Sequence, residues 1–313
     1  MRHKRIAALA AAAALVLGGC GARTESIPDR ASPAVAAIAQ DEARGLYMAP
    51  PFLDAVFHED KAQGDNGVRI DLSAIADGYV AVSAVSDSRL KLQLKYGEDT
   101  YTYDLPPDGT PTVFPLSCGD GDYLVRVMEN VADNRYTEKY SVGFSARLTD
   151  EFQPFLRPSV YVPYSQQSDC VKKAEELTAG AADEIEVVQA IYKFIAANIR
   201  YDRRKAETVQ SGYLPDPDDT MNTGKGICFD YAALAASMLR SRGIPTKMVF
   251  GYVSPKGLYH AWNMFYTESS GWVTVKFETS REGWNRMDMT FVANGSSDKF
   301  VGDGSNYADV YYY

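Results

Sequence analysis

The sequence predicts an α+β protein in which a small antiparallel β-sandwich domain precedes a mixed domain of helices and strands. Residues 66–155 contain short runs in which apolar and polar side chains alternate, and turn signals separate the runs. From about residue 165 the apolar spacing changes to three or four positions, which is typical of helices. Alternation returns after residue 245, so helices are followed by strands within the second part.

The first predicted domain, residues 66–155, reads as strands throughout. Residues 90–96 alternate strictly over seven positions, as a half-buried strand does. Glycine, proline and aspartate separate the strands at the spacing of a sandwich. No group of catalytic side chains is recognised in this part, so we expect a spacer or a binding module. Further strands are predicted at residues 68–72, 79–84, 100–105, 111–116, 123–129 and 140–148.

The second predicted domain, residues 156–313, begins with helices. Isoleucine and valine recur every three or four positions over residues 184–199, which gives this helix one apolar face. A shorter helix is predicted over residues 170–180. Residues 203–222 are polar and contain one glycine and two prolines, so we expect a long functional loop. Strands are predicted at residues 246–253 and 259–266.

The N-terminal residues 1–19 are predicted to be an export signal. Three basic side chains precede an apolar run that is too short to span a bilayer. The run ends in Leu-Gly-Gly-Cys, which resembles the bacterial lipobox; an ordinary secretory signal is the alternative. The resemblance implies that Cys20 is lipidated, that residues 20–65 form a tether, and that the protein is held on the outer face of a bacterial membrane, at the cell surface or in the periplasm.

The charge of the chain argues against nucleic-acid binding. The net charge is −9, and without the three basic residues of the signal the count is 29 basic against 41 acidic side chains. An acidic surface repels a phosphate backbone. Only two histidines follow residue 19, so we expect neither a metal site nor a cofactor.

The remaining cysteines are Cys118, Cys170 and Cys228. In an exported chain Cys118 and Cys170 could form a disulfide; two separate buried thiols are the alternative. Cys228 is then the unpaired thiol. It follows Gly224 and Gly226 and begins a helix predicted to end before Gly243. At a helix start the N–H groups and the dipole favour an anion, so we expect the thiol pKa to fall and a backbone N–H to face a developing oxyanion.

A cysteine nucleophile needs a base, and the chain after the signal offers His58 and His260. His58 lies in the irregular leader, where we expect a solvated surface side chain. His260 begins a predicted strand in the domain of Cys228 and is therefore the candidate base. Asp288 and Glu278 are candidates for the group that orients the imidazole. Glu278 could face His260 if residues 267–271 form a tight turn.

Three motif blocks together resemble the transglutaminase-like superfamily, which is built on the papain-like fold. The similarity covers about residues 165–295. Its blocks are Gly226-Ile227-Cys228-Phe229-Asp230-Tyr231-Ala232, then Arg242-Gly243-Ile244-Pro245 with Gly251-Tyr252, and then His260-Ala261-Trp262-Asn263.

The resemblance implies a cysteine nucleophile, a histidine base and an aspartate that orients the histidine, matching Cys228 and His260 by position. The family often places the aspartate four residues after a tryptophan. Counted from Trp272 this position is Lys276, which cannot serve; counted from Trp284 it is Asp288, followed by methionine where the family has proline. We therefore interpret residues 267–283 as an insertion and Asp288 as the third member, with Glu278 as the alternative.

Several other residues near these motifs receive structural interpretations. Asp230 is expected to be a partner of the helix dipole. Phe229, Tyr231 and Trp262 are expected to pack in the core rather than contact substrate. Tyr213 and the loop acids are expected to be solvated, with contact to substrate or a cation as the alternative. These acids are Asp216, Asp218 and Asp219.

The sequence thus predicts an exported, lipid-anchored thiol enzyme that transfers acyl groups from peptide or carboxamide bonds. Cys228 would form a thioester, His260 would move the proton, and Asp288 would hold His260. The resemblance favours water as acceptor, hence a cysteine peptidase or amidase acting on peptides or proteins of the cell envelope. A cross-linking transglutaminase and a non-catalytic surface binding or scaffold module are the alternatives.

Overall fold

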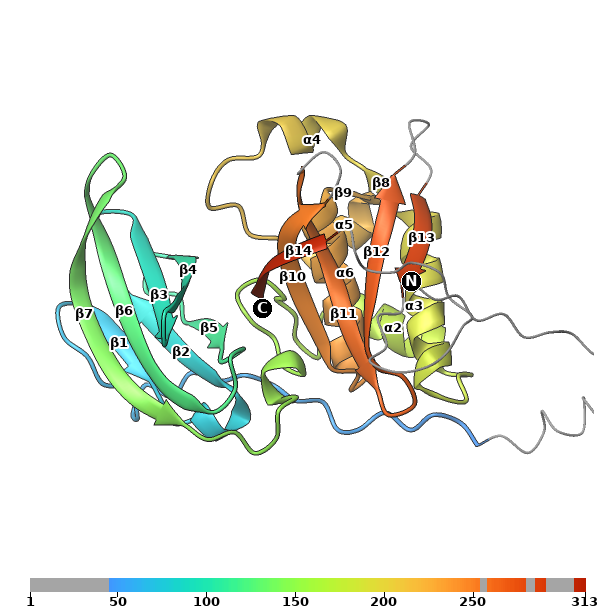
Figure 1. Ribbon diagram of the computed structural model, residues 1–313, viewed down its shortest axis with the longest axis horizontal. Helices are drawn as coiled ribbons and strands as arrows, with labels where there is room; N and C mark the ends of the chain where they lie inside the picture. The colour runs from blue at the N-terminus through green and yellow to red at the C-terminus, as the bar shows by residue number, and fades with distance from the viewer. Residues whose placement is uncertain (1–44, 254–257, 280–284, 291–306) are drawn as a thin grey trace, which may run out of the picture. The chain divides into compact units, whose positions relative to one another are not determined.

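The computed structural model describes residues 45–253, 258–279, 285–290 and 307–313 (Figure 1). Beside the gaps in this range, parts of strands are described by their backbone alone. The lipidation site predicted at Cys20 and the export signal lie outside the described residues. No helix in the described ranges is long and apolar enough to cross a membrane.

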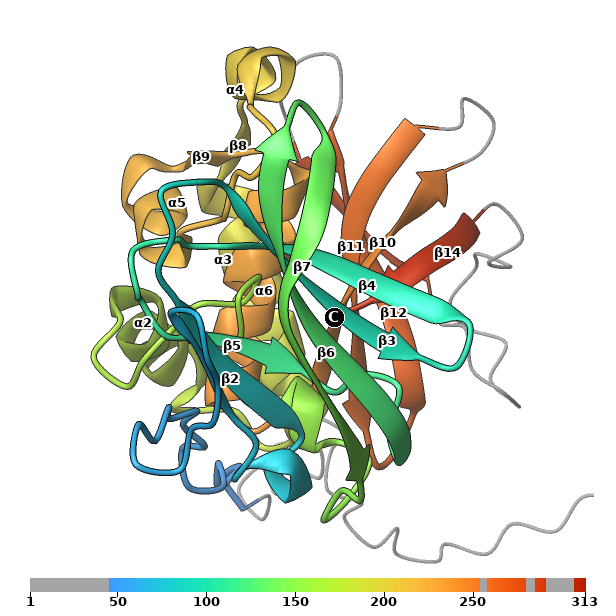
Figure 2. The ribbon, with the colours of Figure 1, turned by 90° about the vertical axis from the view of Figure 1, so that its left-hand side faces the viewer.

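The first half of the described chain forms two antiparallel sheets, and Figure 2 shows the long β6–β7 hairpin within the larger one. The pattern of residues 90–96 explains one of these strands, because its three leucines are buried while the lysines and glutamine between them are partly exposed. That these sheets form a sandwich domain of their own stays a prediction. One sheet has the order β1 (Val68–Asp71), β2 (Tyr79–Ala84), β5 (Thr112–Pro115), and the other β4 (Asp99–Leu105), β3 (Leu90–Tyr96), β6 (Gly121–Ala132), β7 (Arg135–Ala146).

Two single turns of 3-10 helix, η1 (Ile75–Asp77) and η2 (Gln153–Phe155), accompany these sheets. The leader before β1 is packed against the fold. Tyr47 donates its backbone N–H to Ala181 O at 2.7 Å and its hydroxyl to Arg242 O at 2.9 Å. The ring of Phe52 meets that of Tyr164 edge to face, with centroids 5.7 Å apart. Tyr47 and Phe52 therefore hold the leader against residues of the second half.

The two helices predicted before the loop are present as α2 (Asp169–Thr178) and α3 (Glu184–Asn198). Helix α3 begins with a reciprocal cap: the Asp183 carboxylate accepts from Glu186 N at 2.9 Å, and the Glu186 carboxylate accepts from Ala182 N at 2.8 Å. The apolar face predicted from the spacing is buried. It consists of Val187, Val188, Ile191, Tyr192 and Ile195.

The prediction of a long loop over residues 203–222 is wrong. Two short helices occupy this segment, α4 (Arg203–Thr208) and α5 (Pro217–Thr223). Each is started by an aspartate whose side chain accepts a first-turn N–H: Asp202 from Lys205, and Asp216 from Asp219. The polar composition that suggested a loop thus supplies helix caps.

Helix α6 (Cys228–Ser241) is buried along nearly its whole length. Its alanines allow close packing, and near its end Arg240 is buried as well. The Arg240 guanidinium donates to the carbonyl oxygens of Thr246 at 2.9 Å, Arg157 at 2.8 Å and Tyr313 at 3.2 Å. Burial lowers the pKa of Arg240 to about 10, so it remains charged at neutral pH. Gly243, with φ of +79°, follows the helix as predicted.

The chain from residue 246 onward forms a five-stranded antiparallel sheet, covered on one face by helices that include α6 and α3 (Figure 1). The prediction that residues 267–283 are an insertion is wrong, because residues 271–279 are a strand of this sheet. The tight turn is confirmed by the pairing of Thr267 with Gly271. The sheet order is β13 (Asn285–Thr290), β12 (Gly271–Thr279), β11 (Leu258–Thr267), β10 (Thr246–Val253), β14 (Tyr307–Tyr312).

Candidate active site

Cys228 is the first residue of α6, as predicted, and two short strands set its position. Strand β8 (Arg200–Tyr201) pairs in parallel with β9 (Lys225–Gly226), which leads into the cysteine. The two glycines before it act differently. Gly224 has φ of +64° and ends α5, whereas a Cβ on Gly226 would lie 2.7 Å from Asp230 Cβ. The turn into the helix therefore requires glycine at both positions.

Asp230 holds the first turn of α6 in place. It is fully buried, and its Oδ2 accepts from Ile227 N at 2.8 Å. Lys205 Nζ lies 2.7 Å from the same oxygen, and Tyr213 Oη donates to Oδ1 at 2.5 Å. The expectation that Asp230 serves the helix start is confirmed. The charge-assisted bonds also tie the α4 segment to the turn that carries Cys228.

The prediction that the pKa of Cys228 falls is wrong. Burial raises the pKa of the thiol, while the N–H groups of Ala261 and Phe229 lower it and the Asp230 carboxylate raises it further. The dipole of a helix start is therefore outweighed by loss of water around the sulfur. The N–H donors nevertheless stand at the sulfur, where they can stabilise negative charge that develops during a reaction.

His260 lies on β11, the central strand of the sheet, opposite Gly251 of β10. Its imidazole and the Trp262 indole are nearly parallel, with centroids 6.4 Å apart and planes at 20°. Trp262 is buried and also lines the pocket described next, so its interpretation as a packing residue stays a prediction.

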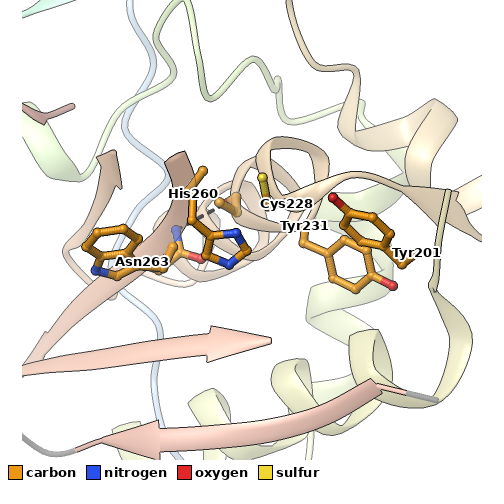
Figure 3. A pocket seen from close by; sticks show the side chains of 8 residues that line it. Tyr201, Cys228, Tyr231, His260 and Asn263 are labelled. Carbon is orange, nitrogen blue, oxygen red and sulfur yellow. Dashed lines mark hydrogen bonds between the residues drawn. The ribbon is translucent and has the colours of Figure 1, made fainter. Parts of the chain in front are cut away.

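One pocket borders both Cys228 and His260 (Figure 3). The sulfur comes from the start of α6 and the imidazole from the sheet, so the two side chains reach the pocket from different layers. The pocket is lined by Tyr201, Cys228, Tyr231, Ala232, His260, Ala261, Trp262 and Asn263. This arrangement joins the two residues that the sequence singled out.

Asn263 locks the strand of the histidine to the helix of the cysteine, and the sequence analysis gave it no role. Its Nδ2 donates to Ala232 O at 3.0 Å, and its Oδ1 accepts from Tyr192 Oη at 3.4 Å. Asn263 is buried. A polar residue between the apolar Ala261 and Phe265 on the same face of the strand was the available signal, since such a buried group needs hydrogen-bond partners.

The third member of the triad stays a prediction. Asp288 lies on β13, opposite Lys276 of β12, so one strand separates it from the strand of His260. That places the two backbones about 10 Å apart at the usual strand spacing. Continuing the β11–β12 register from Asn263 and Val275 brings position 278 opposite His260. The side chains of Glu278 and Asp288 lie outside the described part.

Of the loop acids, Asp216 and Asp219 are exposed, as expected, while the side chains of Asp216 and Asp218 also cap helices. Asp218 accepts from the backbone N–H of Asp169 at 3.1 Å and of Cys170 at 2.8 Å, which joins the starts of α2 and α5. Tyr231 is buried, and Phe229 packs edge to face on Phe250, as expected of core residues. Within the described ranges no three His, Cys, Asp or Glu side chains gather as a metal site.

Cys118 and Cys170 are free thiols in the structure. Burial raises the pKa of each. The His58 side chain is 37% exposed, in line with a surface position, and its Nδ1 lies 3.0 Å from Oδ2 of the buried Asp71. That contact engages His58 within the strand-rich half.

Comparison with known proteins identifies the class of this domain. Residues 171–277 match the model of the transglutaminase-like superfamily. This stretch contains Cys228 and His260 and ends before Asp288. The chain therefore carries a domain of the transglutaminase-like superfamily, as the motif blocks implied.

Individual relatives are distant. The UPF0252 protein MJ1282 of Methanocaldococcus jannaschii is 27% identical over 159 residues, covering 49% of this chain and 43% of that protein. The uncharacterized protein ML0607 of Mycobacterium leprae is 28% identical over 178 residues, covering 53% of this chain and 56% of that protein. The chain thus spans about half the length of the curated relatives it matches.

Among solved structures, the periplasmic domain of TgpA from Pseudomonas aeruginosa is 17% identical and covers 69% of this chain and 73% of that chain, with a TM-score of 0.31.

Proposed function

We propose that this protein is a thiol acyl-transfer enzyme that acts on peptide or carboxamide bonds, with Cys228 as nucleophile and His260 as base. The observation that carries the proposal is the shared pocket, which the sulfur borders from α6 and the imidazole from β11. Membership of the transglutaminase-like superfamily supports the same chemistry.

The proposed reaction follows from the positions of the Cys228 sulfur and the His260 imidazole in one pocket. The sulfur attacks the carbonyl carbon while its proton passes to the imidazole of His260. Because burial raises the pKa of Cys228, the resting sulfur is a thiol, and the proton moves as attack occurs. The imidazolium then protonates the leaving amine, which gives a thioester and a free amine. Asp288, or Glu278 in its place, would hold the imidazole.

Water completes the reaction in the version that we favour. The imidazole takes a proton from water as the water oxygen bonds to the thioester carbon. The carbon–sulfur bond then breaks, the sulfur takes the proton back from the imidazolium, and a carboxylic acid is released. We further propose export, lipid anchoring at Cys20, and peptides or proteins of the cell envelope as substrates. These parts rest on the N-terminal sequence, whose residues the structure does not describe.

Acylation of Cys228 tests the proposal directly. p-Nitrophenyl acetate should release one burst of nitrophenolate per protein and leave an acetyl group on Cys228, seen by mass spectrometry of peptides. His260→Ala should slow this burst by about 10²- to 10⁴-fold, the usual contribution of a general base. Equal release of nitrophenolate by the wild type and Cys228→Ala would refute the proposal that the protein is an enzyme with Cys228 as nucleophile.

The acyl acceptor needs a second measurement. A glutamine-containing peptide is incubated with the protein and a fluorescent primary amine. New peptide ends or released ammonia indicate hydrolysis, whereas amine attached to the peptide indicates cross-linking. Cys228→Ala serves as the blank for both products.

A non-catalytic binding module is the second candidate, and two observations favour it. Lys276 occupies the position where a common family pattern has the orienting aspartate. Burial also disfavours the thiolate of Cys228. This candidate predicts that the peptide binds without turnover and that binding is equal in the wild type and Cys228→Ala.

A further inference from the structure

Tyr201 borders the pocket of Cys228 and His260 but takes no part in the steps above. It is the second residue of β8, and its register partner is Gly226, two positions before Cys228. The parallel pairing therefore holds the tyrosine beside the start of α6. In Figure 3 the hydroxyl of Tyr201 is directed toward the Cys228 side of the pocket.

The hydroxyl of Tyr201 forms no hydrogen bond to any residue that the structure describes. Neighbouring tyrosines differ in this respect. Tyr231 Oη donates to Ile199 O at 2.7 Å, and Tyr213 Oη donates to Asp230 at 2.5 Å. A phenol O–H at a pocket that lacks a protein partner is available to a ligand.

The charges around Tyr201 keep it a donor. Burial raises the pKa of its phenol, and negative charge on the Asp230 carboxylate, or on the Cys228 sulfur when it ionises, raises the pKa further. The phenol is therefore protonated over the neutral range. Negative charge that develops near the sulfur would therefore also favour the protonated form of this hydroxyl.

We infer that Tyr201 Oη donates a hydrogen bond to the oxyanion that forms when Cys228 attacks an acyl carbonyl. As the sulfur–carbon bond forms, the π pair of the carbonyl moves to its oxygen, and the thiol proton passes to His260. The phenol keeps its own proton throughout. The backbone N–H at the start of α6 offers a second donor, so two neutral donors would stabilise one oxygen. This inference rests on the proposed function.

Two probes of Cys228 separate this role from packing. p-Nitrophenyl acetate reacts through an oxyanion, whereas iodoacetamide is displaced at a saturated carbon and forms none. Tyr201→Phe should slow acetylation of Cys228 by about 100-fold, the usual loss of one oxyanion donor, and change alkylation by less than about threefold. Tyr231→Phe is the matched control, because it removes a hydroxyl bound to a backbone carbonyl, and its ratio of the two rates should match the wild type.

Tyr201→His supplies a rescue, since its ring N–H can donate in place of the phenol. It should recover part of the acetylation rate that Tyr201→Phe loses, which a packing role would not give. Acetylation by Tyr201→Phe at the wild-type rate, or an equal loss of both reactions in Tyr201→Phe and Tyr201→His, would overturn the inference and leave the enzyme intact. A wild type that is not acetylated at Cys228 overturns the proposed function and this inference with it.

Discussion

The starts of α2 and α6 both carry a cysteine, yet only one of them borders the pocket of His260. At α2, the Asp218 carboxylate accepts the N–H groups of Asp169 and Cys170. At α6, Asp230 accepts from Ile227 N, one residue before Cys228. The sulfur of Cys228 instead has the N–H groups of Ala261 and Phe229 close by.

The comparison shows that a helix start does not by itself make a reactive thiol. Burial raises the pKa of both Cys170 and Cys228. At Cys170 the carboxylate of Asp218 raises it further, so the free N–H groups of the turn are already used by an anion. What distinguishes Cys228 is the pocket and the donors that remain for a reacting group.

The largest difference between the two helix starts is expected on removal of their carboxylates. Asp230→Ala leaves Lys205 without its buried partner and Ile227 N–H without an acceptor, which should cost about 3–5 kcal/mol. Asp218→Ala removes a partly exposed cap and should cost about 1–2 kcal/mol. Urea unfolding of both variants measures the difference. Equal losses would mean that the two carboxylates play the same part.

A glycine comparison is expected to give an intermediate effect. In Gly226→Ala the new Cβ would lie 2.7 Å from Asp230 Cβ, and the turn before Cys228 must shift, at a cost of about 1–3 kcal/mol. Gly180→Ala, after α2, is the control, because its Cβ meets nothing within 4 Å. Thermal unfolding should show a lower midpoint for Gly226→Ala alone. A midpoint unchanged in both would contradict the close approach.

The smallest effect is a dependence of stability on pH. The folded pKa of both thiols is raised, so their contribution is complete below the unfolded pKa and is lost as pH rises toward the folded value. Each thiol should lower the free energy of unfolding by about 1.4 kcal/mol per pH unit within this window.

The raised thiol pKa values lead to a simple comparison of slopes. Cys170→Ala should flatten the loss of stability between about pH 9 and 10, and Cys228→Ala should flatten it over a narrower range. Urea unfolding at several pH values gives both slopes. A wild-type slope that neither variant changes would show that the thiols do not ionise on unfolding.

The sequence predicted those parts of the molecule that depend on local patterns. Strict alternation identified β3, three- and four-residue spacing identified α3, and the glycines before Cys228 located the start of α6. The scarcity of histidines was sufficient to select His260. In each case the decisive residues lie close together in the chain or belong to a rare residue type.

The parts that the sequence did not predict depend on partners that are distant in the chain. Nothing near Lys205 indicates that it pairs with Asp230, and nothing near His58 indicates Asp71. A fall in the pKa of Cys228 was predicted from its helix position alone. The burial that raises this pKa instead involves residues of β11, which follows much later in the chain. These partners and this burial are determined by tertiary packing, which local propensity does not encode.

Arg240 carries a consequence for how the protein opens. Its guanidinium is bonded to carbonyl oxygens of Arg157, Thr246 and Tyr313, so three separate stretches must be in place before the cation can leave water. If any of these stretches moves away, the buried Arg240 guanidinium loses one of its hydrogen-bond acceptors while it is still out of water. We therefore expect the amide hydrogens of α6 to exchange with deuterium only when the whole unit unfolds, and the helix that carries Cys228 to open last.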